Sequence, residues 1–381
     1  MKIFLITSTR ADFGLLENLI YEFRKSSYFD LKVIVTGTHL SKKHGFSFRE
    51  IKKKKISVYK KILITNNTSS AKNILNDMSI LSKNISYLIK KDKPDLFIVL
   101  GDRYEILAIS LAAYIAKVPI AHIHGGEITQ GSLDDGFRHC ISKLSNLHFV
   151  SHEIYRKRLV QLGENPKTIY NVGALGVENI YKTKFLSKVE LEKSLKIQLK
   201  KNILLVCLQP EITRNLTITL INETLKALKH YNDNSIIFTM PGADFYNDII
   251  FKKVKIFCKS HPNCFSFKTL GSQKFLSLLK IADAIIGNSS SGVIEMPFFK
   301  KPTINIGDRQ RGRVSYNSII NVSAEYSLIK RKIDFIFSRN TGNKKIISPY
   351  KKLSTSKKIL SIIKSYNLEK YKKKKFYDIT Y

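Results

Sequence analysis

The chain contains 381 residues and carries a formal net charge of +35, from 65 lysines and arginines against 30 acidic residues. This length predicts two domains of about 150–200 residues each. The lysines are spread along the whole chain without interleaved aromatic residues, so we expect no nucleic-acid partner. No apolar run reaches the roughly 18 residues of a membrane span, and the first residues do not resemble a signal peptide, so we expect no membrane partner.

Apolar runs alternate with amphipathic segments along almost the whole chain, a pattern typical of an α/β protein with parallel sheets. In the first half, strands are expected at residues 2–8, 31–37, 95–101, 119–124, 147–151 and 168–173. One helix is expected to open in the TRADFG segment, and others at residues 71–91, 103–116, 134–145 and 153–162. Residues 38–70 are basic and aperiodic, which predicts an irregular and mobile loop region.

The pattern pauses near residues 175–185, and a second alternation then begins. Its strands are expected at residues 202–208, 235–240, 265–267, 284–286 and 303–306. We predict two Rossmann-like domains over residues 1–175 and 176–352, followed by a helix and basic tail over 353–381. Ligands of such sheets bind beyond the carboxyl ends of the strands, so the site is expected in a cleft between the domains.

The strand at residues 284–286 is followed by a turn of small residues and the start of a helix. Backbone N–H groups at such a helix start are unpaired and can hold a phosphate, here at Ser289, Ser290, Ser291 and Gly292. Glu295, one turn further on, would repel a phosphate but could accept both hydroxyls of a ribose. The alternative is an ordinary serine N-cap without a ligand.

Polar residues also gather at two neighbouring strand ends in the first half. They are Gly101, Asp102 and Arg103 at the first strand end, and His122, His124 and Glu127 in and after the second. Paired glycines beside His124 favour close approach of a ligand. The structural alternatives are that Asp102 and Asp134 are helix N-caps and that His122 is a buried, hydrogen-bonded histidine.

Metal ligation is not indicated by the sequence. Two histidines at i and i+2 with nearby carboxylates make no convincing site, and the four cysteines lack metal-ligand spacing. We therefore expect no metal. The cysteine usage favours a reduced, cytoplasmic environment.

Six motifs occur in order along nearly the whole chain: GDRYE at 101–105, AHIHGGE at 121–127, DD…RH…SKLS at 134–145, QLGE at 161–164, GNSSSG..E at 287–295 and INIGDRQRGR at 304–313. Together they resemble the hydrolysing UDP-N-acetylglucosamine 2-epimerases, bacterial enzymes of sialic-acid-type sugar synthesis. The resemblance implies a glycosyltransferase-B fold of two Rossmann-like domains, an active site in their cleft, no redox cofactor and a homo-oligomer.

The resemblance also implies a reaction on a UDP-sugar. Removal of the C2 proton and loss of UDP give a 2-acetamidoglycal; water then adds at C1 while C2 is reprotonated on the other face, giving UDP and N-acetylmannosamine. A sister branch acts in this way on UDP-2,4-diacetamido-2,4,6-trideoxyglucose, and a glycosyltransferase of the same fold is a more distant alternative. The sequence leaves the sugar and the oligomeric state open.

The reaction needs an acid/base group on each face of the sugar and positive charge beside the departing diphosphate. By resemblance, Asp102 and Asp134 transfer protons, without a choice of step for either, and Glu127 belongs to the same catalytic set. The residues expected at the diphosphate and nucleotide are Arg10, Arg103, Ser289, Ser290, Ser291, Gly292 and Glu295, with Arg309 and Arg313 closing the cleft. A surface basic loop is the alternative for these last two arginines.

Two positions depart from the pattern of many relatives. His124 stands where many have a glutamate, and a histidine can still exchange a proton near neutral pH. Gln209 stands where the family usually has a histidine, and a glutamine cannot shuttle a proton. Three outcomes are open: His124 takes over that duty, Gln209 only positions the substrate, or the enzyme is slow.

Overall fold

The computed structural model describes the whole chain except residues 131, 339–349, 351, 369–372 and 380–381. The chain divides into two compact units. Unit 1 comprises Met1–Glu127, Leu133–Asn179 and Tyr350–Tyr381, and unit 2 comprises Ile128–Ser132 and Ile180–Pro349. The C-terminal helix and the described tail residues therefore belong to unit 1.

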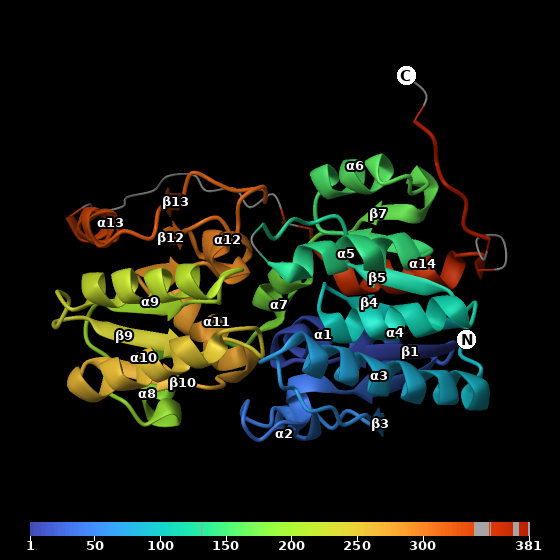
Figure 1. The fold of residues 1–381 in the computed structure, drawn as a ribbon, viewed down its shortest axis with the longest axis horizontal. Helices are drawn as coiled ribbons and strands as arrows, with labels where there is room; N and C mark the ends of the chain where they lie inside the picture. The colour runs from blue at the N-terminus through green and yellow to red at the C-terminus, as the bar shows by residue number, and fades with distance from the viewer. Residues whose placement is uncertain (131, 339–349, 351, 369–372, 380–381) are drawn as a thin grey trace. The chain divides into compact units, whose positions relative to one another are not determined.

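Unit 1 is built on a sheet of seven parallel strands in the order β3-β2-β1-β4-β5-β6-β7 (Figure 1). The strands are β1 (Lys2–Thr7), β2 (Asp30–Val35), β3 (Val58–Lys61), β4 (Leu96–Leu100), β5 (Ile120–Ile123), β6 (Leu147–Val150) and β7 (Ile169–Asn171). The order reverses between β1 and β4, which places a topological switch point there.

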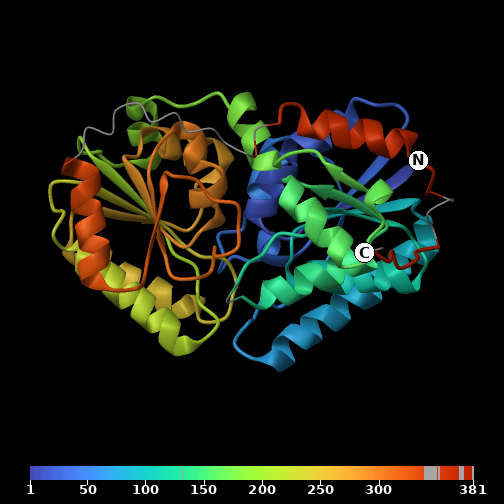
Figure 2. The same ribbon diagram turned by 90° about the horizontal axis from the view of Figure 1, so that it is seen from above.

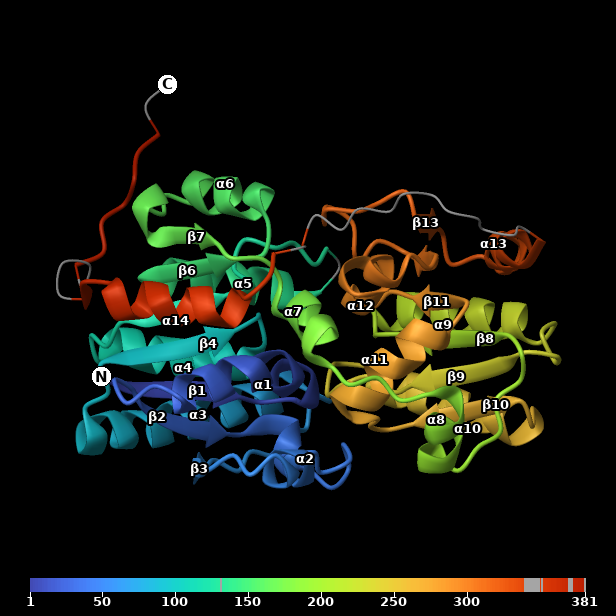
Figure 3. The ribbon, with the colours of Figure 1, turned by 180° about the vertical axis from the view of Figure 1, so that it is seen from behind.

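Helices cover both faces of this sheet because its strands are apolar on both sides. The helices are α1 (Arg10–Arg24), α2 (Phe48–Lys53), α3 (Ala71–Asp92), α4 (Tyr104–Ile115), α5 (Leu133–Leu144), α6 (Glu153–Gln161), α7 (Leu175–Lys182) and α14 (Thr355–Ser365), with short 3-10 turns η1 (Gly37–Leu40) and η2 (Pro166–Thr168). On one face, Ile3 and Leu5 pack with α1 and α14 (Figure 3). On the other, Phe4 and Ile6 pack with α3, α4 and α5.

Unit 2 repeats this plan with six parallel strands in the order β10-β9-β8-β11-β12-β13. Seen from above, helices lie on both faces of the sheet (Figure 2). They are β8 (Ile203–Cys207), β9 (Ser235–Thr239), β10 (Cys264–Phe267), β11 (Ala284–Gly287), β12 (Thr303–Ile306) and β13 (Ile319–Val322). The switch point lies between β8 and β11. Both sheets are parallel and the predicted α/β class with two Rossmann-like units is confirmed.

The described residues of unit 2 contain seven helical segments. They are α8 (Lys188–Leu195), α9 (Arg214–Leu228), α10 (Asn247–Ser260), α11 (Gly271–Ile281), α12 (Ser290–Ile294), η3 (Met296–Phe299) and α13 (Tyr326–Ser338). Leu204 and Val206 face a core shared with α9, α10 and α13. Ile203 and Leu205 face a second core with α8, α11 and η3, so the alternation of β8 side chains serves both layers.

The prediction that residues 38–70 are irregular is wrong. This segment contains η1, α2 and the edge strand β3, which pairs with β2. Phe48 and Ile51 of α2 are buried in the core of unit 1. Strand β3 escaped detection because its last two residues, Lys60 and Lys61, are exposed, as is usual at a sheet edge.

Among the described residues, no helix combines the length and the apolar character needed to cross a membrane.

Candidate functional site

Four of the predicted site residues lie beyond the carboxyl ends of the strands that flank the switch points. In unit 1, Arg10 follows β1 and Asp102 follows β4. In unit 2, Gln209 follows β8 and Ser289 follows β11. Sheets of this kind bind their ligands at these positions, so each unit carries one candidate half-site.

In unit 1, Arg138 of α5 joins the ends of β4 and β5. Its side chain is 3% exposed and forms an ion pair with Asp102, whose side chain is 20% exposed. The Arg138 Nη1 atom also donates to the carbonyl of His124 at 3.1 Å and lies 4.0 Å from Glu127 Oε2. One buried cation thus connects three predicted site residues, and Asp102 keeps partial contact with solvent.

Asp134 lies on the same helix, inside the first turn of α5 and half-buried. Asp134 and Arg138 are four residues apart, so they share one helix face with Cβ atoms about 5–6 Å apart. Neither aspartate is the N-cap that the structural alternative required, because Arg103 occupies the N-cap position of α4 and Asp134 lies within α5. The arrangement therefore places Asp134 on the face of α5 that carries the partner of Asp102.

Glu127 and His124 form the second part of this cluster. Ser151 Oγ donates to Glu127 Oε1 at 2.8 Å, and His124 Nδ1 lies 3.5 Å from the same oxygen. His124 has a φ of +66°, in the left-handed region that a histidine visits only at a cost of order 1–3 kcal/mol. The donation from Arg138 to its carbonyl helps to hold this conformation.

The two glycines of the His-Gly-Gly-Glu turn are explained by the protein itself. A Cβ on Gly125 would lie 2.9 Å from Ser142 Oγ, and one on Gly126 would lie 2.5 Å from the carbonyl oxygen of Tyr155. Gly126 also has a φ of +74°. The sequence interpretation that these glycines admit a ligand is therefore replaced by close packing of the turn on α5 and α6.

His122 has a structural role, as the sequence favoured. It is fully buried, and its Nε2 atom lies 2.7 Å from the carbonyl of Gly101. A carbonyl only accepts, so Nε2 carries the hydrogen and Nδ1 accepts from Ser142 Oγ at 3.0 Å. Burial lowers the pKa of His122 to about 3, so it stays neutral and fixes the residue before Asp102.

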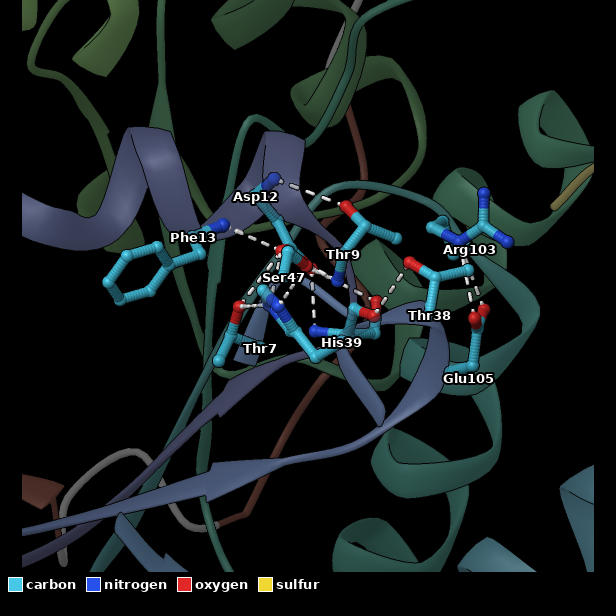
Figure 4. A network of polar contacts seen from close by, with 10 residues as sticks. Thr7, Thr9, Asp12, Phe13, Thr38, His39, Ser47, Arg103 and Glu105 are labelled. Atoms are coloured by element: carbon cyan, nitrogen blue, oxygen red, sulfur yellow. Dashed lines mark hydrogen bonds and ion pairs between the residues drawn. The ribbon is translucent and has the colours of Figure 1, made fainter. Parts of the chain in front are cut away.

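The turn that carries Arg10 is held by a buried polar network (Figure 4). Asp12 accepts from the N–H groups of Ser8 and Thr9, both at 2.8 Å, and its Oδ1 lies 3.7 Å from His39 Nε2. Burial opposes ionisation of Asp12, but His39 and the Ser8 N–H outweigh it and lower its pKa. Arg10, half-buried at the start of α1, therefore projects from a fixed turn.

The side chain of Arg103, the residue after Asp102, is held by an ion pair with Glu105. Its Nε donates to both carboxylate oxygens of Glu105, at 3.3 and 3.1 Å (Figure 4). Glu105 is completely buried, and burial raises its pKa while the Arg103 charge opposes the rise. Such a guanidinium is oriented before a ligand arrives, at the cost of a buried carboxylate.

In unit 2, the side chain of Asn288 links the ends of β8 and β11. Its Oδ1 accepts from the Gln209 N–H at 2.7 Å, and its Nδ2 donates to the Gln209 carbonyl at 2.9 Å and to Glu211 Oε1 at 2.8 Å. Its own carbonyl accepts from Gln310 Nε2 at 2.8 Å. Asn288 is completely buried and adjoins Ser289, so it fixes the serine turn to the segment that contains Gln209.

The serine turn differs in two ways from its predicted form. Helix α12 has only five residues, because Pro297 and the 3-10 turn η3 follow directly, and Ser289 Oγ caps it by accepting from the Ser291 N–H at 3.4 Å. The N-cap alternative is therefore present in the structure. Glu295 is not one turn into a longer helix but sits at the C-cap of α12, 8% exposed.

Gly292 and the arginines after β12 have defined surroundings. A Cβ on Gly292 would lie 2.7 Å from Thr303 Cγ2, so this glycine allows α12 to pack on β12. Arg309 Nη1 lies 3.5 Å from the Asn288 carbonyl. Arg313 donates to the carbonyl of Ile128 at 2.9 Å and to Thr129 Oγ1 at 3.1 Å. Its side chain is therefore held by the protein, unlike that of an arginine in a solvated surface loop.

Sequence reasoning gave no role to Arg138, Asn288 or Glu211. Arg138 belongs to the RH pair of the 134–145 motif, and Asn288 precedes the three serines, so both had a sequence signal. Their function as bridges between strand ends depends on tertiary contacts that periodicity does not reveal.

Two further results concern metal binding and a surface cavity. No group of three or more His, Cys, Asp or Glu side chains that could hold a metal ion occurs in the described part of the chain. A surface cavity of about 390 Å³ on unit 1, lined among others by Arg156, Tyr170 and Lys358, contains none of the predicted site residues.

Residues 21–364 match a protein family described as UDP-N-acetylglucosamine 2-epimerase. The GDP/UDP-N,N'-diacetylbacillosamine 2-epimerase (hydrolyzing) of Campylobacter jejuni is 43% identical over 323 residues, covering 84% of each chain. The polysialic acid biosynthesis protein P7 of Escherichia coli is 36% identical over 387 residues, covering 99% of this chain and 97% of that one. The fold is similar to that of UDP-GlcNAc 2-epimerase from Neisseria meningitidis bound to UDP-GlcNAc, with a TM-score of 0.82 over 96% of this chain and 100% of that one, at 20% identity.

Proposed function

Because this chain belongs to the UDP-N-acetylglucosamine 2-epimerase family, we propose that it is a hydrolysing UDP-sugar 2-epimerase that converts UDP-N-acetylglucosamine to UDP and N-acetylmannosamine. The observation that carries the proposal is that a motif of the family directly follows one of the strands that flank the switch point in each unit. Asp102 follows β4 in unit 1, and Ser289 follows β11 in unit 2.

Unit 1 supplies the groups that move hydrogen in this proposal. Asp102 is partly exposed and oriented by Arg138, and Asp134 lies on the same face of α5 as Arg138. One of these carboxyl groups takes the C2 proton while UDP leaves, and the other delivers a proton to the opposite face as water adds at C1. His124 and Glu127, which lie 3.5 Å apart, are a further pair able to exchange a proton.

Unit 2 binds the nucleotide in this proposal. The hydroxyl and N–H groups of Ser289, Ser290 and Ser291, together with Gly292, hold the diphosphate, and Glu295 accepts the ribose hydroxyls. With only five residues, α12 contributes little dipole, so direct hydrogen bonds carry this binding. Positive charge for the leaving diphosphate comes from Arg10, Arg103, Arg309 and Arg313. Gln209, whose backbone is fixed by Asn288, positions the substrate without exchanging a proton.

A second substrate is favoured by the name of a relative. The Campylobacter jejuni relative, at 43% identity, is named for N,N'-diacetylbacillosamine, the 2,4-diacetamido-2,4,6-trideoxy sugar. The same C2 chemistry applies to that sugar because both substrates carry a 2-acetamido group and a UDP leaving group. The two candidates differ only at C4 and C6.

The test is incubation of the purified protein with each UDP-sugar in heavy water. An epimerase releases UDP without an acceptor and yields the inverted free sugar with deuterium at C2. Release of UDP only on addition of an acceptor sugar would indicate a glycosyltransferase, and UDP-sugar binding without turnover would indicate a binding protein. The ratio of kcat/KM for the two UDP-sugars identifies the substrate.

A further inference from the structure

The segment after β8 contains an ionisable residue that the proposed mechanism does not use. In the sequence Gln209-Pro210-Glu211, Gln209 cannot change its charge, whereas Glu211 can. Glu211 reaches the serine turn through Asn288, because Asn288 Nδ2 donates to Glu211 Oε1 at 2.8 Å and Ser289 is the next residue of the chain.

Contacts to both the backbone and the carboxyl group of Glu211 fix its position. Thr217 Oγ1 accepts from the Glu211 N–H at 3.0 Å, and Gly307 faces the carboxyl group so closely that an added Cβ would lie 3.3 Å from Oε1. The charged groups that act on it are Arg309 and Asp308, both from the loop after β12. Burial raises the pKa of Glu211, whereas the Asn288 hydrogen bond and the Arg309 charge oppose the rise.

We infer that Glu211 is a positioning residue whose protonation controls the affinity of the serine turn for UDP. This inference rests on the proposed function. In its neutral form, Glu211 supports Asn288 and adds no negative charge near the diphosphate. In its ionised form, it keeps the hydrogen bond but repels the diphosphate from a half-buried position where solvent screens little.

The sign of the pH dependence follows from linkage. Repulsion by bound UDP raises the pKa of Glu211 further, so UDP binding takes up a proton and the affinity falls as the pH rises through that interval. Glu211→Gln removes the charge and retains an oxygen that accepts from Asn288. It therefore mimics the neutral form at every pH.

The experiment is calorimetric titration of UDP into the wild-type protein and Glu211→Gln between pH 5 and pH 8. We expect the wild-type protein to lose about tenfold more affinity over this interval than Glu211→Gln, and the variant to bind UDP more tightly at pH 8. Titration of UDP itself affects both proteins equally. Binding in two buffers of different ionisation enthalpy should show proton uptake by the wild-type protein in excess of the variant.

Two further variants keep the inference testable if Glu211→Gln does not fold. Glu211→Asp retains a carboxyl group and should retain the pH dependence. Asp308→Asn, at an acid whose side chain is 76% exposed, should also retain it. Parallel pH curves for wild type and Glu211→Gln, or loss of the pH dependence in Glu211→Asp, would overturn the inference alone. Absence of UDP binding by the wild-type protein at every pH would overturn the proposed function as well.

Discussion

Unit 1 and unit 2 both carry their candidate residues beyond the strands that flank a switch point, but the two sets of side chains differ in charge. In unit 1, the buried Arg138 is surrounded by the carboxylates of Asp102 and Glu127. In unit 2, the buried centre is the neutral amide of Asn288, which bonds to the backbone of Gln209 and to Glu211.

This difference indicates how the same sheet topology can serve two tasks. Buried ion pairs cost desolvation energy, and their retention in unit 1 suits the proton exchange that we propose for its carboxyl groups. Neutral amide and hydroxyl groups cost less to bury and can hold an anion without competing for its charge. The comparison therefore predicts that changes in unit 1 affect turnover and changes in unit 2 affect UDP affinity.

The largest effect is expected from loss of the buried cation in unit 1. Arg138→Met leaves Glu127, 2% exposed, beside Asp102 without their shared partner, which should lower the free energy of unfolding by about 3–5 kcal/mol. Urea denaturation measures this change. Arg156→Met is the matched control, since its partner Glu153 is 48% exposed and the pair is worth at most about 1 kcal/mol. Equal destabilisation by both variants would show that the buried Arg138 ion pairs contribute no more to stability than an exposed ion pair.

Turnover should depend on Asp102 more than UDP binding does. Asp102→Asn keeps a hydrogen-bonding side chain but cannot exchange a proton in the proposed reaction, so kcat should fall about 10²-fold or more while the Kd for UDP stays unchanged. Asp95→Asn, at the other end of β4, is the control, because this aspartate accepts from the Lys2 N–H at 2.7 Å, away from the site. Near wild-type activity in Asp102→Asn would reduce Asp102 to a structural partner of Arg138.

A change in unit 2 should have the opposite signature. Glu295→Ala removes the proposed acceptor of the ribose hydroxyls and should weaken UDP binding by about tenfold, the equivalent of about one charge-assisted hydrogen bond. The sugar product should still be inverted at C2. The exposed Glu325→Ala provides the control for loss of an acidic side chain in the same unit. If UDP affinity is the same in both variants, the ribose assignment is wrong.

The sequence could predict the inner strands and the edge strands β7 and β10, but not the edge strands β3 and β13. Strands such as β4 (Leu96–Leu100) and β11 (Ala284–Gly287) are short apolar runs between breaking residues, so they are visible without a structure. The edge strands β3 and β13 were missed; β3 ends in exposed lysines, and the burial of β13 is only partial.

The candidate sites could also be predicted only in part, because the contacts that fix them join residues far apart in the sequence. The ends of β4 and β11 could be proposed as candidate sites from the polar residues that follow each strand. The contacts that fix them could not, because Arg138 lies 36 positions from Asp102 and Asn288 lies 79 positions from Gln209. Likewise, the glycines after His124 suggested a ligand, and only the structure revealed that Tyr155 and Ser142 occupy that space.

The smallest change in stability is expected from Lys374, in the C-terminal tail that contacts α5. Lys374 Nζ donates to the carbonyl of Ser142 at 3.2 Å and pairs with Glu164 Oε2 at 2.6 Å. Burial lowers the pKa of Lys374 to about 8, and Glu164 only partly opposes this. The folded protein therefore releases this proton between about pH 8 and the ordinary lysine value, whereas the unfolded chain keeps it, so the contribution of Lys374 to stability rises with pH in that window.

Comparison of the wild-type protein with Lys374→Met tests this sign. From pH 7.5 to pH 9.5, the free energy of unfolding of the wild-type protein should rise relative to the variant by about 1 kcal/mol, since the mostly exposed tail can also detach locally. Lys143→Met is the control, at a lysine that is 43% exposed and pairs with the same glutamate. The difference in unfolding free energy between the wild-type protein and Lys143→Met should change less over this pH range. A relative loss of stability at pH 9.5 would mean that the ion pair with Glu164 outweighs the cost of burying the ammonium group.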